Sequence, residues 1–146
     1  MEAGGVRVLL DMIVKGILKV LFFVFAIIFC NISNAQRLKN GSGSIVGYIE
    51  NGRVKNSSGS VSGYIEDGRV KNSSGSIIGY FDQERIKNSS GSIIGYFNGE
   101  TVKNSSGSII GYINDGRVKN RSGSIIGYYE NVRRIEAALY FFFFFY

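Results

Sequence analysis

Tyrosine and lysine recur at intervals of sixteen residues along this 146-residue chain, and their side chains offer an aromatic ring beside a positive charge. A cation and an aromatic ring attract each other, and such pairs suit the recognition of anionic lipid or glycan. The candidate binding residues are five tyrosines and five lysines: Tyr48, Tyr64, Tyr80, Tyr96, Tyr112, Lys55, Lys71, Lys87, Lys103 and Lys119. The competing interpretation is that each pair only packs across two strands and binds no ligand.

Other kinds of chemistry lack their usual groups in this sequence. The chain has no histidine, and its one cysteine, Cys30, lies in the N-terminal region, so common nucleophile–base pairs and transition-metal sites lack their parts. Acidic residues of the repeats fall at turn positions, where charged side chains face solvent: Glu50, Glu66, Asp67, Asp82, Glu84, Glu100 and Asp115. We therefore expect a non-enzymatic protein without a cofactor or a bound metal.

A sixteen-residue repeat must position the tyrosines and lysines. Residues 107–122, GSIIGYINDGRVKNRS, form a clear copy. The copies follow one another without insertion and begin at Gly43, Gly59, Gly75, Gly91, Gly107 and Gly123. Copies in constant register indicate one supersecondary unit that is repeated.

Each copy has the pattern of a β-hairpin. In the first copy, residues 44–50 are rich in β-branched and aromatic residues, and Asn51-Gly52 is a strong signal for a type I′ turn. A return strand over residues 53–56 and a Ser-Ser-Gly turn over 57–59 complete the unit.

The turn at 51–52 fixes which residues face each other. It predicts the pairs Glu50–Arg53, Ile49–Val54, Tyr48–Lys55 and Gly47–Asn56. The same alternation predicts one apolar, inward face, made by Ile45, Gly47, Ile49 and Val54. The opposite, wetter face is made by Val46, Tyr48, Glu50, Arg53 and Lys55.

Departures from the consensus predict local differences. Asp67-Gly68 and Asp115-Gly116 suit the same turn, whereas Asn98-Gly99 sits one position early. Gln83-Glu84 and Asn131-Val132 suit it poorly, so we expect those loops to open or change type. A glycine also recurs in mid-strand, where it marks a bulge, a bend or close packing at an axis: Gly47, Gly63, Gly79, Gly95, Gly111 and Gly127.

An isolated hairpin of this size is not stable, so the copies must share a core. One solution is a closed antiparallel ring, which removes the sheet edges. The alternative is a parallel β-solenoid, which would stack equivalent lysines about 4.8 Å apart and make them repel. The Asn-Gly turns and this repulsion favour the closed ring.

Residues 1–35 have the pattern of a secretory signal peptide. Lys15 and Lys19 precede an eleven-residue apolar run, and Ser33 and Ala35 are small residues suited to cleavage before Gln36. Met12 is an alternative start. We expect export from a bacterial cell, to the periplasm or cell envelope, where nucleic acid is not an expected partner. Removal of residues 1–35 changes the net charge from +6 to about +5, which favours anionic surfaces.

The chain closes with an alanine pair and an aromatic run over residues 137–146. Together with repeats of the GSIIGYI-x-NG-RVKNSS type and the apparent leader, this ending resembles the five-fold β-flower family of exported bacterial proteins. The resemblance covers about residues 36–146 and implies a shallow symmetric barrel with hairpins splayed as petals. It implies no biochemical activity and carries over no functional residue. Residues 37–40 match a return strand, so both five and six petals are open.

Three segments therefore follow from the sequence: a signal peptide over 1–35, a hairpin domain over 36–136 and a hydrophobic tail over 137–146. The tail predicts a last strand or a plug in the middle of the ring. A membrane-inserting or partner-binding anchor is the alternative. We expect an envelope module that binds anionic lipid or glycan, or else a structural protein that self-associates through the tail.

Overall fold

The computed structural model describes residues 3–28 and 35–146. The chain divides into two units, Met1–Ser33 and Asn34–Tyr146. The first contains helix α1 (Ala3–Ile28), on which Asp11 and Lys15 form an ion pair of 3.0 Å. Among the described residues, no helix combines the length and apolar character needed to cross a membrane. Cys30 and the predicted cleavage-site residue Ser33 lie outside the described residues.

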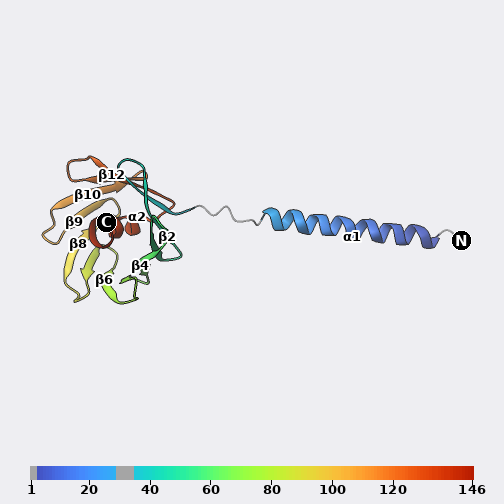
Figure 1. The fold of residues 1–146 in the computed structure, drawn as a ribbon, viewed down its shortest axis with the longest axis horizontal. Coiled ribbons are helices and arrows are strands. Elements are labelled where there is room, and N and C mark those ends of the chain that lie inside the picture. The colour runs from blue at the N-terminus through green and yellow to red at the C-terminus, as the bar shows by residue number, and fades with distance from the viewer. Residues whose placement is uncertain (1–2, 29–34) are drawn as a thin grey trace. The chain divides into compact units, whose positions relative to one another are not determined.

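The second unit is a closed antiparallel β-barrel (Figure 1). Each strand pairs with its neighbours in sequence, and β1 pairs with β12 to close the ring. The strands are β1 (Arg37–Asn40), β2 (Ile45–Glu50), β3 (Arg53–Asn56), β4 (Val61–Glu66), β5 (Arg69–Asn72), β6 (Ile77–Phe81), β7 (Arg85–Asn88), β8 (Ile93–Phe97), β9 (Thr101–Asn104), β10 (Ile109–Asn114), β11 (Arg117–Asn120) and β12 (Ile125–Glu130). The closed ring is confirmed, and the parallel solenoid is not the fold.

The two ends of the barrel sequence build a sixth petal. Five hairpins have a turn that joins their strands, namely β2–β3, β4–β5, β6–β7, β8–β9 and β10–β11. Strands β12 and β1 pair in the same register, with Glu130 opposite Arg37 and Tyr128 opposite Lys39, although no turn links them. The described barrel therefore has five continuous petals and a sixth made from both ends.

The hairpin turns follow the sequence prediction. Asn51 and Gly52 have φ values of 49° and 77°, as a type I′ turn requires, and the turns at 67–68 and 115–116 have the same signs. The loop after β6 opens to residues 82–84, where an Asp82 carboxylate oxygen accepts a hydrogen bond of 3.0 Å from the Arg85 amide. The loop after β8 likewise spans 98–100, and Asn98 Oδ1 accepts a bond of 3.0 Å from the Thr101 amide.

An asparagine builds each turn at the opposite end of the strands. Asn56 Oδ1 accepts hydrogen bonds from the Ser58 amide (3.0 Å), the Ser58 hydroxyl (2.7 Å) and the Ser60 amide (3.0 Å). The same three donors surround the equivalent asparagine in every copy, including Asn40 at the start of the barrel. These side-chain bonds satisfy backbone groups that the strand ladder leaves free.

The predicted pairing within hairpins is confirmed, but the predicted inner face is partly wrong. Gly47, Ile49 and Val54 point inward and are buried, whereas Ile45 is 37% exposed. The cause is a β-bulge: Leu38 faces Gly47 but Lys39 faces Ile45, so Val46 is an extra residue. The extra residue reverses the alternation of side chains. Ile45 therefore lies on the outer face, and Val46 packs against the core.

The barrel interior is filled by the residues after β12. Helix α2 (Arg134–Ala138) continues into a π-helix, η1 (Leu139–Phe144), and Figure 1 shows the C-terminus in the middle of the ring. Ala137, Ala138 and Leu139 are fully buried. The strand residues in the same core are Leu38, Ile49, Val54, Ile65, Val70, Ile86, Phe97, Val102, Ile113 and Val118. The tail is thus a helical plug, and its interpretation as a last strand was wrong.

Six consecutive aromatic residues of the plug each lie over one mid-strand glycine. The pairs, identified by the ring that a Cβ at each glycine would meet, are Tyr140–Gly47, Phe141–Gly127, Phe142–Gly111, Phe143–Gly95, Phe144–Gly79 and Phe145–Gly63. At Gly95, for example, a Cβ would lie 2.4 Å from Phe143 Cε1 and 2.6 Å from the Lys103 carbonyl oxygen. The recurrent glycine therefore leaves space for an aromatic ring and lies next to the bulge. A bulge and close packing at an axis were two of the three roles predicted for it.

The wide helix matches the number of repeats. The Phe145 amide donates to the Tyr140 carbonyl oxygen over 3.4 Å, and the Tyr146 amide donates to the same oxygen over 3.1 Å. These bonds span five and six residues instead of the four of an α-helix. The chain consequently makes one circuit of the barrel in six residues, with one ring for each repeat.

Candidate functional site

The outer wall of the barrel carries the predicted tyrosine–lysine pairs. We use "outer wall" for the six equivalent tyrosines and the basic residues on the strands beside them. Tyr48, which is half-buried, lies opposite Lys55 on β3 and opposite Arg37 on β1. Each ring is placed in the same way between two strands, and the residues opposite it are basic on both sides except at Tyr112, which faces Thr101 on β9.

All five predicted pairs are neighbours across a strand ladder. They are Tyr48–Lys55, Tyr64–Lys71, Tyr80–Lys87, Tyr96–Lys103 and Tyr112–Lys119. A sixth pair, Tyr128–Lys39, was missing from the sequence prediction. The signal was present, because residues 37–40 (RLKN) match the return strand, but the pair forms only when the ring closes.

Most of the lysines on the outer wall are neutralised by an acid on the same hairpin. Lys55 contacts Glu50 at 2.5 Å, and Lys71 contacts Glu66 at 2.6 Å. The hydrogen bond from Lys71 and then its charge hold the pKa of Glu66 below its ordinary value. Lys39 makes the equivalent ion pair with Glu130 across the β12–β1 closure.

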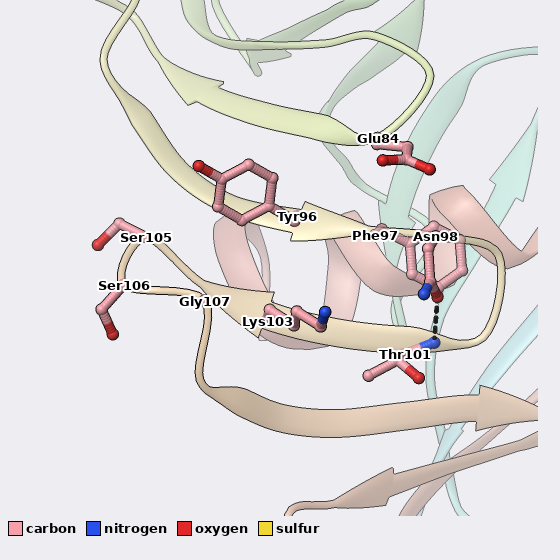
Figure 2. A pocket seen from close by; sticks show the side chains of 9 residues that line it. All are labelled: Glu84, Tyr96, Phe97, Asn98, Thr101, Lys103, Ser105, Ser106 and Gly107. Atoms are coloured by element: carbon pink, nitrogen blue, oxygen red, sulfur yellow. Dashed lines mark hydrogen bonds between the residues drawn. The ribbon is translucent and has the colours of Figure 1, made fainter.

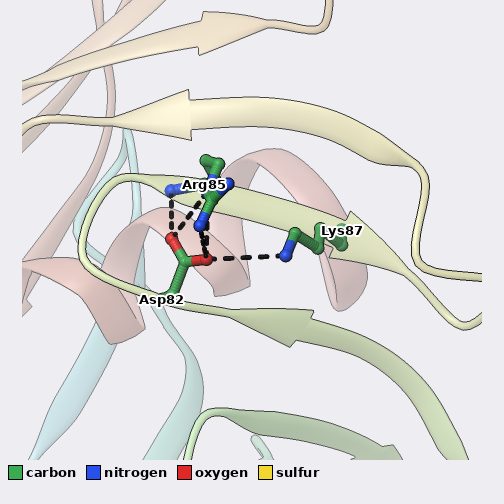
Figure 3. A network of polar contacts seen from close by, with 3 residues as sticks. All are labelled: Asp82, Arg85 and Lys87. Carbon is green, nitrogen blue, oxygen red and sulfur yellow. Dashed lines mark hydrogen bonds and ion pairs between the residues drawn. The ribbon is translucent and has the colours of Figure 1, made fainter.

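The third hairpin uses a denser arrangement around Asp82 (Figure 3). Arg85 Nη2 lies 2.9 Å from Asp82 Oδ2, and Lys87 Nζ lies 3.5 Å from the same oxygen. The Arg85 amide, followed by the Arg85 side chain, lowers the pKa of Asp82 to about 2. Asp82 therefore stays ionised in neutral and mildly acidic solution and neutralises the wall at this hairpin.

Two adjacent hairpins lack this acid. Asn98 and Asn114 occupy the position of Glu50, two residues after the wall tyrosine. Within residues 3–28 and 35–146, neither Lys103 nor Lys119 forms an ion pair within 4.0 Å. In addition, Thr101 replaces the arginine that begins the return strand of other copies. The repeated wall is therefore asymmetric, which its tyrosine and lysine spacing did not reveal.

A groove of about 370 Å³ lies at the first of these hairpins (Figure 2). It is lined by Glu84, Tyr96, Phe97, Asn98, Thr101, Lys103, Ser105, Ser106 and Gly107. Hydroxyl, amide, carboxylate and ammonium groups thus surround one tyrosine ring. A second groove, of about 410 Å³, includes Lys39, Tyr128 and Glu130 at the β12–β1 closure, where the lysine is paired.

The aromatic tail presents a different surface. Tyr140 and Phe141 are buried, residues 142–145 are partly exposed, and Tyr146 is 63% exposed. The Tyr140 hydroxyl donates a hydrogen bond of 3.1 Å to the Val46 carbonyl oxygen, and burial raises the pKa of this phenol. The buried Glu136 is held by Arg133, which bonds its carboxylate through both amide (3.1 Å) and guanidinium (2.7 Å).

The described residues contain no group of three or more His, Cys, Asp or Glu side chains that could hold a metal ion.

The family model described as 5-fold beta-flower protein matches residues 35–145 of the chain. Neither the curated proteins nor the solved structures contain a match to the chain.

Proposed function

The chain belongs to the family of 5-fold beta-flower proteins, and we propose that it is an exported, non-enzymatic module that binds anionic lipid or glycan at the cell envelope. The observation that carries the proposal is the outer wall, on which each of six tyrosines lies opposite a lysine. A partly buried aromatic face next to an ammonium group supports contact with a flat or anionic ligand.

Charge supports an anionic ligand. The chain carries 17 Lys and Arg against 11 Asp and Glu, and Lys103 and Lys119 lie where the acid of other hairpins is replaced by asparagine. An excess of exposed positive charge raises the local concentration of anions and accelerates their association.

The test compares two anionic probes and their neutral counterparts. The expressed chain is mixed with phosphatidylcholine vesicles with or without phosphatidylglycerol, and with polygalacturonate or its methyl ester. We expect retention by at least one anionic probe, with weaker binding as salt screens the charges. Binding that ignores both probe charge and salt, or no binding to either anionic probe, would refute the proposal.

Export is tested separately. The basic, apolar and small-residue sequence of residues 1–35 supports cleavage before Gln36. Mass spectrometry of the protein from a bacterial periplasmic fraction should give a chain that starts at Gln36. A chain that keeps residues 1–35 and stays in the cytoplasm would contradict export.

A second candidate function is self-association through the tail. The partly exposed rings of residues 142–145 and the exposed Tyr146 favour it, since exposed apolar surface often marks an interaction site. The Tyr146→Ser variant should then sediment as a smaller species than the unmodified chain. Identical sedimentation at all concentrations would remove this candidate.

A further inference from the structure

Equivalent hairpins of the outer wall differ in whether their lysine has an acidic partner. In four hairpins the lysine of the outer wall has an acidic partner: Lys39 with Glu130, Lys55 with Glu50, Lys71 with Glu66, and Lys87 with Asp82. The lysine side chains are only partly exposed, and that of Lys55, for instance, is 26% exposed. At these positions a ligand would have to displace a carboxylate that the protein already supplies.

The β8–β9 hairpin removes this competition. Asn98 replaces the acid. Its Oδ1 accepts a hydrogen bond of 3.0 Å from the Thr101 backbone amide, so the Asn98 side chain is held within its own turn. Thr101 also replaces the long arginine of other copies with a short side chain. In the described part of the chain, Lys103 consequently forms no ion pair with a carboxylate.

The groove beside Lys103 supplies further contacts for a ligand. Figure 2 shows Tyr96 and Lys103 on adjacent strands, Ser105 and Ser106 on the loop at one end, and Glu84 across from them. A volume of about 370 Å³ is at the lower end of the range for small-molecule sites. The groove therefore suits a small polar molecule with one negative group better than an extended surface.

We infer that this groove is the principal ligand site of the outer wall and that its ligand is an acidic saccharide. The inference rests on the proposed function and narrows it. The carboxylate of the sugar pairs with the Lys103 ammonium, and its ring lies against Tyr96. Its hydroxyls bond Ser105 and Glu84 and donate to the Ser106 hydroxyl, whose own proton goes to Asn104 Oδ1 over 2.8 Å.

Glu84 favours a saccharide over a phospholipid. Its exposed carboxylate accepts hydrogen bonds from the several hydroxyls of a sugar ring, whereas a phosphate diester has no proton to donate to it. The neighbouring β10–β11 hairpin differs, because the Asn114 side-chain amide donates a hydrogen bond of 2.6 Å to the Glu100 carboxylate, which keeps an acid at that position.

The experiment titrates the full chain with oligogalacturonate and with its methyl ester by calorimetry. The Lys103→Gln variant removes the cation, and Asn98→Glu restores the acid found in the other hairpins. We expect each to weaken oligogalacturonate binding roughly tenfold, the loss of one charge-assisted hydrogen bond. The matched comparison, Lys55→Gln, changes a wall lysine already paired with Glu50 and should weaken oligogalacturonate binding much less than Lys103→Gln does.

The outcomes separate this inference from the proposed function. If the unmodified chain binds oligogalacturonate and Lys103→Gln and Lys55→Gln weaken it equally, the location is wrong and the binding function stands. If the chain binds phosphatidylglycerol vesicles but not oligogalacturonate, the saccharide assignment is wrong. If it binds neither probe, the proposed function itself fails. Unchanged melting temperatures of the variants ensure that lost affinity does not reflect unfolding.

Discussion

The six copies of the repeat are alike inside the barrel, but they differ from one another on its outer wall. Inside, all six copies keep a glycine at one position, and each glycine receives one aromatic ring of the plug. Outside, four copies pair their lysine with an acid, and the two adjacent copies of the β8–β9 and β10–β11 hairpins carry asparagine instead. The difference teaches that packing fixes the inner position in every copy, whereas wall positions in contact with solvent can diverge from copy to copy.

Removal of residues 140–146 should reduce the stability of the barrel more than any of the substitutions below. Deletion of a buried aromatic ring costs about 3–5 kcal/mol, and the buried rings of Tyr140 and Phe141 alone approach the total stability of a small domain. We expect the shortened chain to lose its cooperative thermal transition in circular dichroism. As a control, Tyr146→Ala should retain it, because that ring is 63% exposed. A shortened chain that melts near the original temperature would show that the plug does not support the barrel.

The substitution Gly95→Ala should be the next largest in effect. The new Cβ would lie 2.4 Å from Phe143 Cε1, so the free energy of unfolding should fall by about 1–3 kcal/mol in urea denaturation. The same substitution in a Phe143→Ala background should cost less, because only the contact with the Lys103 carbonyl oxygen remains. An equal cost in both backgrounds would contradict the pairing of ring and glycine.

Tyr140→Phe tests the one polar contact of the plug rings. It removes the hydrogen bond to the Val46 carbonyl oxygen, and we expect a loss of about 0.5–1.5 kcal/mol in the free energy of unfolding. Tyr146→Phe is the matched control, since its exposed hydroxyl makes no recorded hydrogen bond within the described residues. Equal effects of the two substitutions would remove the special role of Tyr140.

The outer wall should respond to acid with a smaller effect. Because folding lowers the pKa of Asp82 from 3.8 to about 2, its stabilisation is present above about pH 4 and is lost as the pH falls toward 2. Asp82→Asn should therefore reduce the decrease in melting temperature between pH 4 and pH 2. Asp115→Asn, which keeps a residue suited to the left-handed turn, is the control. An unchanged pH profile for Asp82→Asn would argue against the network in Figure 3.

Much of the fold could be predicted because the repeat contains its own turn signals. Asn51-Gly52 fixed the register, and with it the Tyr48–Lys55 pair and the closed antiparallel ring. A bulge was one of three alternatives predicted at Gly47, but the extra residue, Val46, could not be identified, because its position depends on the pairing with the neighbouring strand. Ile45 was therefore assigned to the wrong face.

The plug was foreseen only in outline. A run of aromatic residues predicts burial, but the helical path of Tyr140–Phe145 depends on six glycines spread over the whole barrel. The asymmetric wall was harder still, since Asn98 and Thr101 look like ordinary turn variation. Their significance appears only when ion pairs on equivalent hairpins are compared.

The one-to-one match between plug rings and barrel glycines also limits how such a chain can change in length. Duplication of a sixteen-residue copy would open a seventh position on the inner wall that no side chain fills, and loss of a copy would leave a surplus phenylalanine. Either event leaves a void or a clash unless the distant aromatic run gains or loses a residue as well. The length of the aromatic run therefore has to match the number of petals. The repeats and the aromatic run, which are separate segments of the chain, must change together.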